Sequence, residues 1–400
     1  MNDQLSIAVV IGDAIILMSG TLVLLAIARK SASSRVCTLI VLAVVGHFLV
    51  GLMLQYGGLA SDAREYHVDA FQLSAYWGGD APSAPVLTDG KQGWVWLLAT
   101  IYLVISPHLS LGIAVNAVLL AAVPLIMFGI VREFARRETA DRAALLVFLV
   151  PAQWLWGSLP LREASVTMIL SISTWATIAV VKRGRASAWV ALGLSLVALL
   201  AFRGSLSIVV TAAVVAVVLL TTAGGRTSTP AKVLAVPAII AMGIFGQVAL
   251  STAGSDISVE RIGAVRTSQS VNASTGFDTR SPTDGVGGAV GNATSVFPRI
   301  VMGPFPWEIS GALVALIPDA IFWWFAVIYA FLGSRTVVGR RELLPLLLPL
   351  LGLLVALSVY SGNYGTMMRL RAGGLVYMIP LMALALEQRS GRRTPSGSIR

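Results

Sequence analysis

Long apolar runs are the feature that most restricts how this 400-residue chain can fold. A helix needs about 20 mostly apolar residues to cross the hydrocarbon layer of a membrane. The runs that approach or exceed this length are 6–28, 36–57, 109–131, 143–160, 163–181, 187–202, 204–222, 233–251, 312–333, 343–360 and 373–387. We therefore predict an all-α polytopic membrane protein, with residues 1–400 forming a single transmembrane domain of about 11 helices, within a range of roughly 10 to 12.

The composition agrees with this prediction. Hydrophobic residues make up 56% of the chain and charged residues only 12%, whereas soluble domains carry roughly 25% charged residues. A soluble core could not bury so much apolar surface, because single cores stop growing at about 250–300 residues. The one cysteine, Cys37, excludes an internal disulfide framework and a cysteine-based metal cluster.

Basic residues are distributed unevenly between the predicted loops. Cytoplasmic loops of membrane proteins carry an excess of Lys and Arg. With the N-terminus placed outside and helix 6–28 retained rather than cleaved as a signal, 19 of the 29 Lys and Arg residues fall on the cytoplasmic side. They are Arg29, Lys30, Arg35, Arg132, Arg136, Arg137, Arg142, Lys182, Arg183, Arg185, Arg226, Lys232, Arg335, Arg340, Arg341, Arg389, Arg392, Arg393 and Arg400. The net charge of +10 is thus explained by membrane topology and requires no nucleic-acid partner.

Two outer segments are long. Residues 58–108 form the first predicted extracytoplasmic loop, and residues 252–311, rich in Gly, Ser, Thr and Asp, form the second. We expect the second loop to be partly mobile, because it has few apolar residues to anchor it. The chain ends in a basic cytoplasmic tail, residues 388–400.

Within the first loop, the apolar stretch 94–106 is too short to cross a membrane unaided. If it crossed, every later basic loop would move to the outer side. We therefore predict a helix that lies in the outer interface, with Trp94, Trp96 and Tyr102 at the level of the lipid headgroups. A short true span is the alternative.

An acidic cluster opens the first outer loop, in the sequence Ser61-Asp62-Ala63-Arg64-Glu65-Tyr66-His67-Val68-Asp69-Ala70. If residues 61–72 are helical, Asp62, Glu65 and Asp69 share one face. Such a face can supply a general base, orient an acceptor hydroxyl or hold a divalent cation. Ordinary surface charges at the start of a loop are the alternative interpretation.

Arginines recur at or near the predicted outer face, at Arg162, Arg203, Arg299, Arg369 and Arg371. A charge near lipid is costly and usually has a functional or structural partner. Guanidinium groups bind phosphate through paired hydrogen bonds, so arginines from several helices would form an anion site at the membrane surface. Each arginine could instead extend to phospholipid headgroups.

Two further ionisable residues lie inside apolar runs. Asp319 is expected to pair with an arginine or to stabilise a helix break, because an isolated carboxylate in a membrane is costly. His47 is interpreted as a buried, hydrogen-bonded histidine. The three histidines lie in three different segments, which makes a histidine-rich zinc site improbable.

Several of these segments resemble the GT-C superfamily of integral membrane glycosyltransferases, in the branch of protein O-mannosyltransferases, aminoarabinose transferases and bacterial polysaccharide enzymes. The stretch Asp62 to Ala70 is similar to that branch's acidic first-loop motif, and Asp89-Gly90-Lys91-Gln92-Gly93-Trp94 is similar to the interfacial helix that follows it. Leu159 to Ser165, Phe297 to Glu308 and Asn363 to Gly374 resemble pieces of bacterial polysaccharide membrane proteins. The chain departs from the family pattern in having two predicted spans and an outside start before the acidic loop.

The resemblance implies transfer of a sugar from a polyprenyl-phosphate-linked donor to a glycan, lipid or protein acceptor, on the extracytoplasmic face of the cell membrane and with inversion at the anomeric carbon. It implies that Asp62 is the catalytic base and that Glu65 assists it or binds a divalent cation. No cofactor is otherwise implied. The candidate substrate-binding residues are Arg64, Tyr66, His67, Lys91, Arg162, Glu163, Arg203, Arg299, Arg369 and Arg371.

The sequence is compatible with three other functions. A polymerase or ligase of the O-antigen type would bind a lipid diphosphate with the outer arginines and would not need Asp62. A flippase or transporter of lipid-linked glycans would need polar residues along a path through the bilayer, and the apolar runs contain few of them. A scaffold for envelope assembly is the last alternative.

Overall fold

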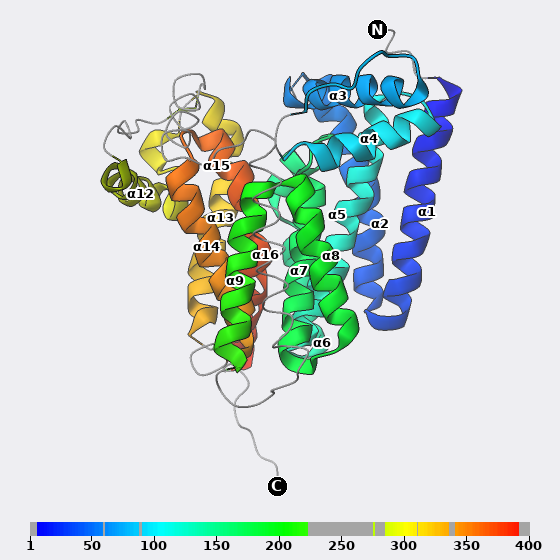
Figure 1. Ribbon diagram of the computed structural model, residues 1–400. Helices are drawn as coiled ribbons and strands as arrows, with labels where there is room; N and C mark the ends of the chain where they lie inside the picture. The colour runs from blue at the N-terminus through cyan, green and yellow to red at the C-terminus, as the bar shows by residue number, and fades with distance from the viewer. Residues whose placement is uncertain are drawn as a thin grey trace.

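The computed structural model describes residues 6–58, 61–87, 90–222, 275–276, 285–309, 311–335 and 341–391. Long helices lie side by side in this part of the chain, and two shorter helices cross one end of the assembly (Figure 1). Eight of the described helical segments are long and apolar enough to cross a membrane. The predicted all-α polytopic architecture is confirmed for the described residues.

The helix bounds follow the predicted apolar runs closely. The long helices are α1 (Ile7–Ser31), α2 (Ser34–Tyr56), α5 (Leu109–Arg132), α7 (Glu163–Arg183), α9 (Gly204–Thr222), α13 (Ile317–Ser334), α14 (Leu344–Tyr360) and α16 (Leu375–Gly391). A shorter helix, α8 (Ala186–Phe202), is also apolar. The predicted span 233–251 lies outside the described residues, so the total of about 11 helices stays a prediction.

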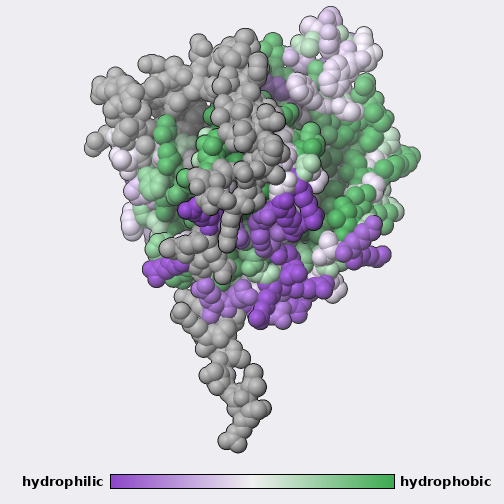
Figure 2. All heavy atoms as spheres, turned by 60° about the horizontal axis from the view of Figure 1, so that its bottom comes forward, coloured by the Kyte–Doolittle hydropathy of each residue, from purple (hydrophilic) through white to green (hydrophobic). Residues whose placement is uncertain are grey.

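The two ends of the helix bundle differ. Helices α3 (Ser61–Gly78) and α4 (Gln92–Val104) lie across one end, which we call the Asp62 end (Figure 1). Helix α7 begins there with Glu163 and finishes at the opposite end, which we call the Arg183 end. Figure 2 brings the Arg183 end forward and shows hydrophilic side chains gathered on it. Within the described parts of the chain, the turns that carry Arg29, Arg132 and Arg183 thus share one end of the bundle.

Contacts between turns hold the Arg183 end together. Arg137 donates to the carbonyl oxygen of Ala32 at 2.8 Å, which joins the start of α6 (Arg137–Phe148) to the α1–α2 turn. Lys182 lies 4.0 Å from the carboxylate of Glu342, which joins the end of α7 to the turn before α14. The turns are therefore neighbours in space as well as similar in charge.

The prediction of one continuous span over 143–160 is wrong. The structure has α6 up to Phe148, a break, and then a π-helical turn at Gln153–Gly157. Pro151 explains the break, because proline disfavours helical geometry at the residue before it. The broken segment still connects the two ends of the bundle, since the carbonyl oxygen of Pro160 accepts a hydrogen bond from Trp94 of α4 at 3.0 Å.

Helix α4 does not extend through the bundle, but its aromatic residues do not lie as predicted. Trp94 and Tyr102 are buried between α4 and its neighbours, and of the three predicted interfacial aromatics Trp96 alone is exposed. Tyr102 is held by a 2.8 Å hydrogen bond to His67 of α3. The prediction failed for these two residues because tertiary packing covers them: α3 covers Tyr102, whereas Trp94 packs against Pro160 and Gly112.

The predicted outer segment 252–311 contains a helix in its described C-terminal part. Residues Gly285–Met302 form a helix, α12, which packs against α14. Val296 and Ile300, four residues apart, are both fully buried. Burial of this apolar face offsets the cost of the glycines in the helix. At the C-terminus, α16 continues to Gly391, and the remainder of the predicted tail lies outside the described residues.

Candidate functional site

Helix α3 presents the acidic face that the sequence predicts. Its opposite face is buried against α4 and consists of Ala63, Tyr66, Ala70 and Leu73, spaced three and four residues apart as one helical face requires. Asp62 lies in the first turn, where a carboxylate is stabilised by the helix dipole. Packing of α3 on α4 therefore directs Asp62 and Glu65 away from the core.

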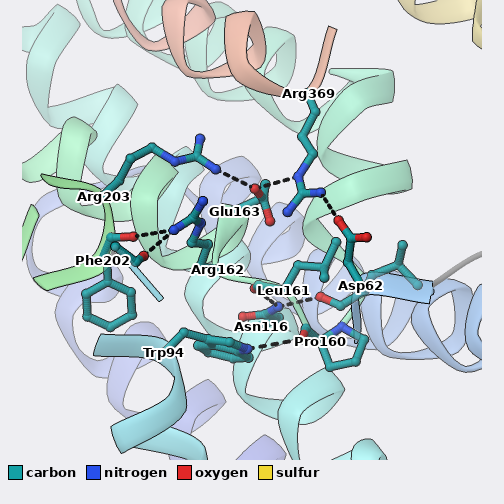
Figure 3. A network of polar contacts seen from close by, with 12 residues as sticks. Asp62, Trp94, Asn116, Pro160, Leu161, Arg162, Glu163, Phe202, Arg203 and Arg369 are labelled. Atoms are coloured by element: carbon teal, nitrogen blue, oxygen red, sulfur yellow. Dashed lines mark hydrogen bonds and ion pairs between the residues drawn. The ribbon is translucent and has the colours of Figure 1, made fainter. Parts of the chain in front are cut away.

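Glu163, the first residue of α7, is the centre of an ion-pair network (Figure 3). Its Oε1 atom accepts a hydrogen bond of 2.6 Å from Nε of Arg369 and one of 2.8 Å from Nη2 of Arg203. Arg369 also donates through Nη1 to Oδ2 of Asp62 at 2.7 Å. The network joins α3, α7, the α8–α9 junction and α15 (Tyr364–Arg371).

Arg162 and Lys91 complete the cationic side of the site. Arg162 donates to the carbonyl oxygen of Gly90 and, at 3.3 Å, to that of Phe202. Lys91 pairs with Glu65, and its ammonium group lies 5.4 Å from the centre of the Tyr66 ring. These contacts fix Lys91 beside α3 and Arg162 between Gly90 and Phe202.

Apart from Glu163, which lies outside the lining, the charged side chains of this network line a cavity of about 220 Å³ at the Asp62 end. Its lining consists of Asp62, Glu65, Tyr66, Lys91, Arg162, Arg203, Thr366, Arg369 and Leu370. The side chain of Asp62 is 55% exposed, so its carboxylate is open to the cavity, whereas that of Arg369 is only 15% exposed. The site therefore combines an accessible carboxylate with guanidinium groups that are largely withdrawn from water.

Burial affects the ionisation of two groups here. Burial lowers the pKa of Arg203 to about 10, with the neighbouring Arg162 adding to the effect and Glu163 opposing it. Arg203 therefore keeps its charge at neutral pH. Burial also raises the pKa of Tyr66, whose phenol stays protonated. An anion in this cavity would face charged guanidinium groups rather than neutral ones.

Four predicted site residues lie away from this cavity. Arg64 is exposed on α3, and His67 is buried against Tyr102. Arg299 pairs with Glu308 at 3.1 Å. Arg371 is fully buried, 3.8 Å from Asp319, with its guanidinium 4.5 Å from the centre of the Trp323 ring. Of the two roles considered for Asp319, pairing with an arginine is the one that the structure contains.

Two lining residues escaped the sequence analysis. Thr366 and Leu370 of α15 contact the cavity beside Arg369. The spacing in Tyr-Gly-Thr-Met-Met-Arg-Leu-Arg could have indicated that Thr366 lies near the site. Thr366 precedes Arg369 by three residues and so shares its helical face. That face could be read only once a helix was known to begin at Tyr364.

The donor set for a divalent cation does not fit this cavity well. The described lining offers the carboxylates of Asp62 and Glu65, and each is already paired with a cationic side chain. Hard cations such as Mg²⁺ prefer several oxygen ligands. Within the described parts of the chain, His, Cys, Asp and Glu form no group of three or more suited to a metal ion.

Comparison with known proteins identifies the class of fold. No family model and no curated protein matches the sequence. Among solved structures, the chain is similar to the archaeal oligosaccharyltransferase AglB from Archaeoglobus fulgidus, in complex with an inhibitory peptide and a dolichol-phosphate. The TM-score is 0.51 at 11% identity, and the match covers 91% of this chain and 51% of that one. This chain therefore spans about half the length of AglB.

At this level of identity the likeness establishes fold alone. The chain shares the overall fold of AglB, and eight helices in its described parts are long and apolar enough to cross a membrane, in agreement with the predicted all-α polytopic architecture.

Proposed function

We propose that this protein is a membrane glycosyltransferase that moves a sugar from a polyprenyl-phosphate-linked donor to a hydroxyl of a glycan, lipid or protein acceptor, in the branch of the O-mannosyltransferases and aminoarabinose transferases. One observation carries the proposal: the accessible carboxylate of Asp62 and the guanidinium groups of Arg162, Arg203 and Arg369 line the same cavity. A base for the acceptor and a cationic site for the donor phosphate are thereby adjacent.

The chemistry assigns each group a role. Asp62 takes the proton of the acceptor hydroxyl while the hydroxyl oxygen attacks the anomeric carbon. The bond from that carbon to the phosphate oxygen breaks, its electron pair stays on the phosphate, and the configuration inverts. Negative charge grows on the leaving phosphate, where prepositioned guanidinium groups stabilise it most. Arg369 contacts Asp62 directly and so couples the two halves of the site.

The charge of the site favours a donor with one phosphate. Lys91, Arg162, Arg203 and Arg369 are balanced by three carboxylates, those of Asp62, Glu65 and Glu163, which leaves one positive charge. A sugar linked through a single phosphodiester carries one negative charge, whereas a diphosphate-linked sugar carries two. The balance therefore favours a glycosyltransferase over a lipid-diphosphate polymerase or ligase.

The distribution of basic residues indicates which side of the membrane the site faces. Turns at the Arg183 end carry many Lys and Arg side chains, including Lys30, Arg132 and Arg185, and such turns face the cytoplasm. The Asp62 end then faces the extracytoplasmic side of the cell membrane. A long polyprenyl tail would lie among lipids while its phosphate reached the cavity at the surface, which explains why the site lies at the ends of the helices.

Replacement of Asp62 tests the proposed base. We expect Asp62→Asn to lower kcat for transfer from polyprenyl-phosphate sugar in proteoliposomes by at least about 100-fold, because an amide cannot accept the proton. Asp80→Asn is the matched control, since Asp80 is exposed beyond the end of α3 and does not line the cavity. Full activity of a folded Asp62→Asn protein would refute the assignment.

Replacement of Arg369 tests the donor site. We expect Arg369→Ala to lower kcat/KM for the donor by about tenfold or more, because it removes charge-assisted hydrogen bonds to the phosphate. Arg185→Ala, at the opposite end, is the control. Parallel reactions with polyprenyl-diphosphate sugar discriminate the rival function, because a polymerase or ligase would prefer that donor and tolerate Asp62→Asn. Donor movement without sugar transfer would instead indicate a flippase.

A further inference from the structure

A second cavity lies at the Arg183 end, remote from Asp62. Its volume is about 460 Å³, and its lining includes Arg132, Phe134, Arg136, Leu384, Glu387 and Gln388. Arg132 is the last residue of α5, and Leu384 to Gln388 belong to the last turns of α16. The cavity thus lies where two membrane helices end, at the depth of lipid headgroups rather than of acyl chains.

The turn that lines this cavity is held in a fixed geometry. Glu133 pairs with Arg183 at 2.5 Å. Its second oxygen lies 4.0 Å from Lys182, whose ammonium group is 5.1 Å from the centre of the Phe134 ring. Arg132 donates to the carbonyl oxygen of Ala135 at 3.2 Å. Glu133 is therefore neutralised by α7 and does not cancel the charges of the cavity arginines.

The local charge is suited to an anion. Arg132 and Arg136 both contribute guanidinium groups, and Glu387 is the carboxylate among the lining residues. Two arginines therefore face one carboxylate, which leaves the lining of the cavity with a net positive charge.

The remaining lining points to a lipid rather than a soluble anion. Phe134 and Leu384 place apolar surface beside the two arginines, and both residues also pack into the hydrophobic core of the bundle. Gln388 adds an amide that can bond a headgroup hydroxyl. Basic pockets between membrane helices on the cytoplasmic side commonly hold anionic headgroups.

The geometry points to a site for the phosphodiester headgroup of an anionic phospholipid in the leaflet at the Arg183 end, with Arg132 and Arg136 on the phosphate and Glu387 and Gln388 near the headgroup hydroxyls. This site is independent of the proposed transferase cavity, and it is expected to hold a structural lipid rather than the donor. A negative result here would leave the proposed function unaffected.

Native mass spectrometry of the detergent-purified full chain tests the site. Phosphatidylglycerol is titrated against wild type, Arg132→Ala/Arg136→Ala and Arg29→Ala/Lys30→Ala. The last variant removes two exposed basic residues from the same end but outside the cavity. We expect the cavity variant to raise the Kd for phosphatidylglycerol by at least about tenfold, and the control variant to stay within about twofold of wild type.

Two further arms complete the design. Phosphatidylcholine and inorganic phosphate, each titrated alone, are expected to bind at least about tenfold more weakly than phosphatidylglycerol, because each lacks either the net charge or the lipid. Arg136→Ala alone, an exposed substitution, serves if the double variant does not fold, and Arg132→Lys/Arg136→Lys should restore most of the binding. Equal loss in the Arg29/Lys30 control, or equal binding of phosphatidylcholine or of free phosphate, would overturn the proposal.

Discussion

Glu163, which was predicted as one of the substrate-binding residues, organises the ion pairs of the site. It is almost fully buried, and one of its oxygens binds both Arg203 and Arg369. Without this carboxylate the two guanidinium groups would repel each other in a poorly solvated position. Glu163 therefore acts as a positioning residue, which holds the arginines that would meet the donor.

Substitution of Glu163 should affect both stability and donor binding. Because Glu163→Gln leaves two buried arginines without their shared counter-charge, we expect a loss of about 3–5 kcal/mol in the free energy of unfolding. We also expect donor KM to rise while Glu163→Asp restores part of it. Thermal unfolding and steady-state kinetics measure the two effects. A lower Tm with unchanged donor KM would show a purely structural role.

Glu342→Gln is the matched control for this substitution. The Glu342 side chain is 56% exposed and lies 4.0 Å from Lys182 at the opposite end of the bundle. Exposed ion pairs of this kind contribute about 0–1 kcal/mol. The control variant should therefore keep the wild-type Tm and donor KM.

The sequence indicated a set of arginines near the outer face, but it could not show which of them line the cavity. Arg369 and Arg371 are two residues apart on α15, and residues at that spacing do not share a helix face. Arg369 therefore faces the cavity while Arg371 faces the interior and pairs with Asp319. The same spacing separates Asp62 from Arg64. His47 could be predicted, because a buried imidazole needs a partner, and it bonds Ser158 at 2.8 Å.

At the scale of elements, the segment from Val301 to Glu308 is fastened beside α15 by several side chains. Trp323 and Trp324 of α13 donate to the carbonyl oxygens of Val301 and Met302. Glu308 accepts hydrogen bonds from the phenol of Tyr364, from the backbone N–H of Phe305 at 3.0 Å and from Arg299 at 3.1 Å. Glu308 thereby links α12, this segment and α15.

This link should be sensitive to pH. Burial alone would raise the pKa of Glu308, but hydrogen bonds from Tyr364, Phe305 and Arg299 outweigh it and lower the pKa. The folded state then binds the proton more weakly than the unfolded state. The carboxylate therefore stabilises the fold above its ordinary pKa, and this contribution is lost as pH falls through the lowered value.

We accordingly expect the Tm difference between wild type and Glu308→Gln to be largest near pH 6 to 7 and to shrink below about pH 4. Thermal unfolding in buffers across that range, on the full chain in detergent, provides the measurement. Asp80→Asn, at an exposed position, is the matched control. A Tm difference that is constant with pH would contradict the assigned role of the charge.

Element bounds could be predicted where a run was long and uniform, as for α1, α2 and α5. The sequence could not resolve places where tertiary packing decides. Pro151 stands inside an apolar run, and hydropathy alone does not reveal a break there. Residues Gly285–Met302 are glycine-rich, and their helix depends on burial of Val296 and Ile300 against α14, a partner some 50 residues away.

In the whole molecule, the charges and the candidate site are separated along the helix axes. The structure places the Asp62 cavity and the basic turns at opposite ends of the same helices (Figures 1 and 2). The likeness to AglB concerns the fold and covers 91% of this chain. The polytopic class could be predicted because apolar length and charge bias are properties of single segments. The cavity could not, because it joins residues from Asp62 to Leu370.

We predict that the Asp62 end of the molecule faces the outside of the cell and that the Arg183 end faces the cytoplasm. The chain has one native cysteine, Cys37, so a Cys37→Ser background carries no thiol. Asp80→Cys and Arg185→Cys then place single thiols at exposed positions at the two ends of the bundle. In intact cells, a membrane-impermeant maleimide should label Asp80→Cys but not Arg185→Cys, and both should react after the membrane is permeabilised. The reverse pattern would place the Asp62 cavity on the cytoplasmic side and would therefore refute an extracytoplasmic transferase. It would also mean that the basic turns oppose the positive-inside rule.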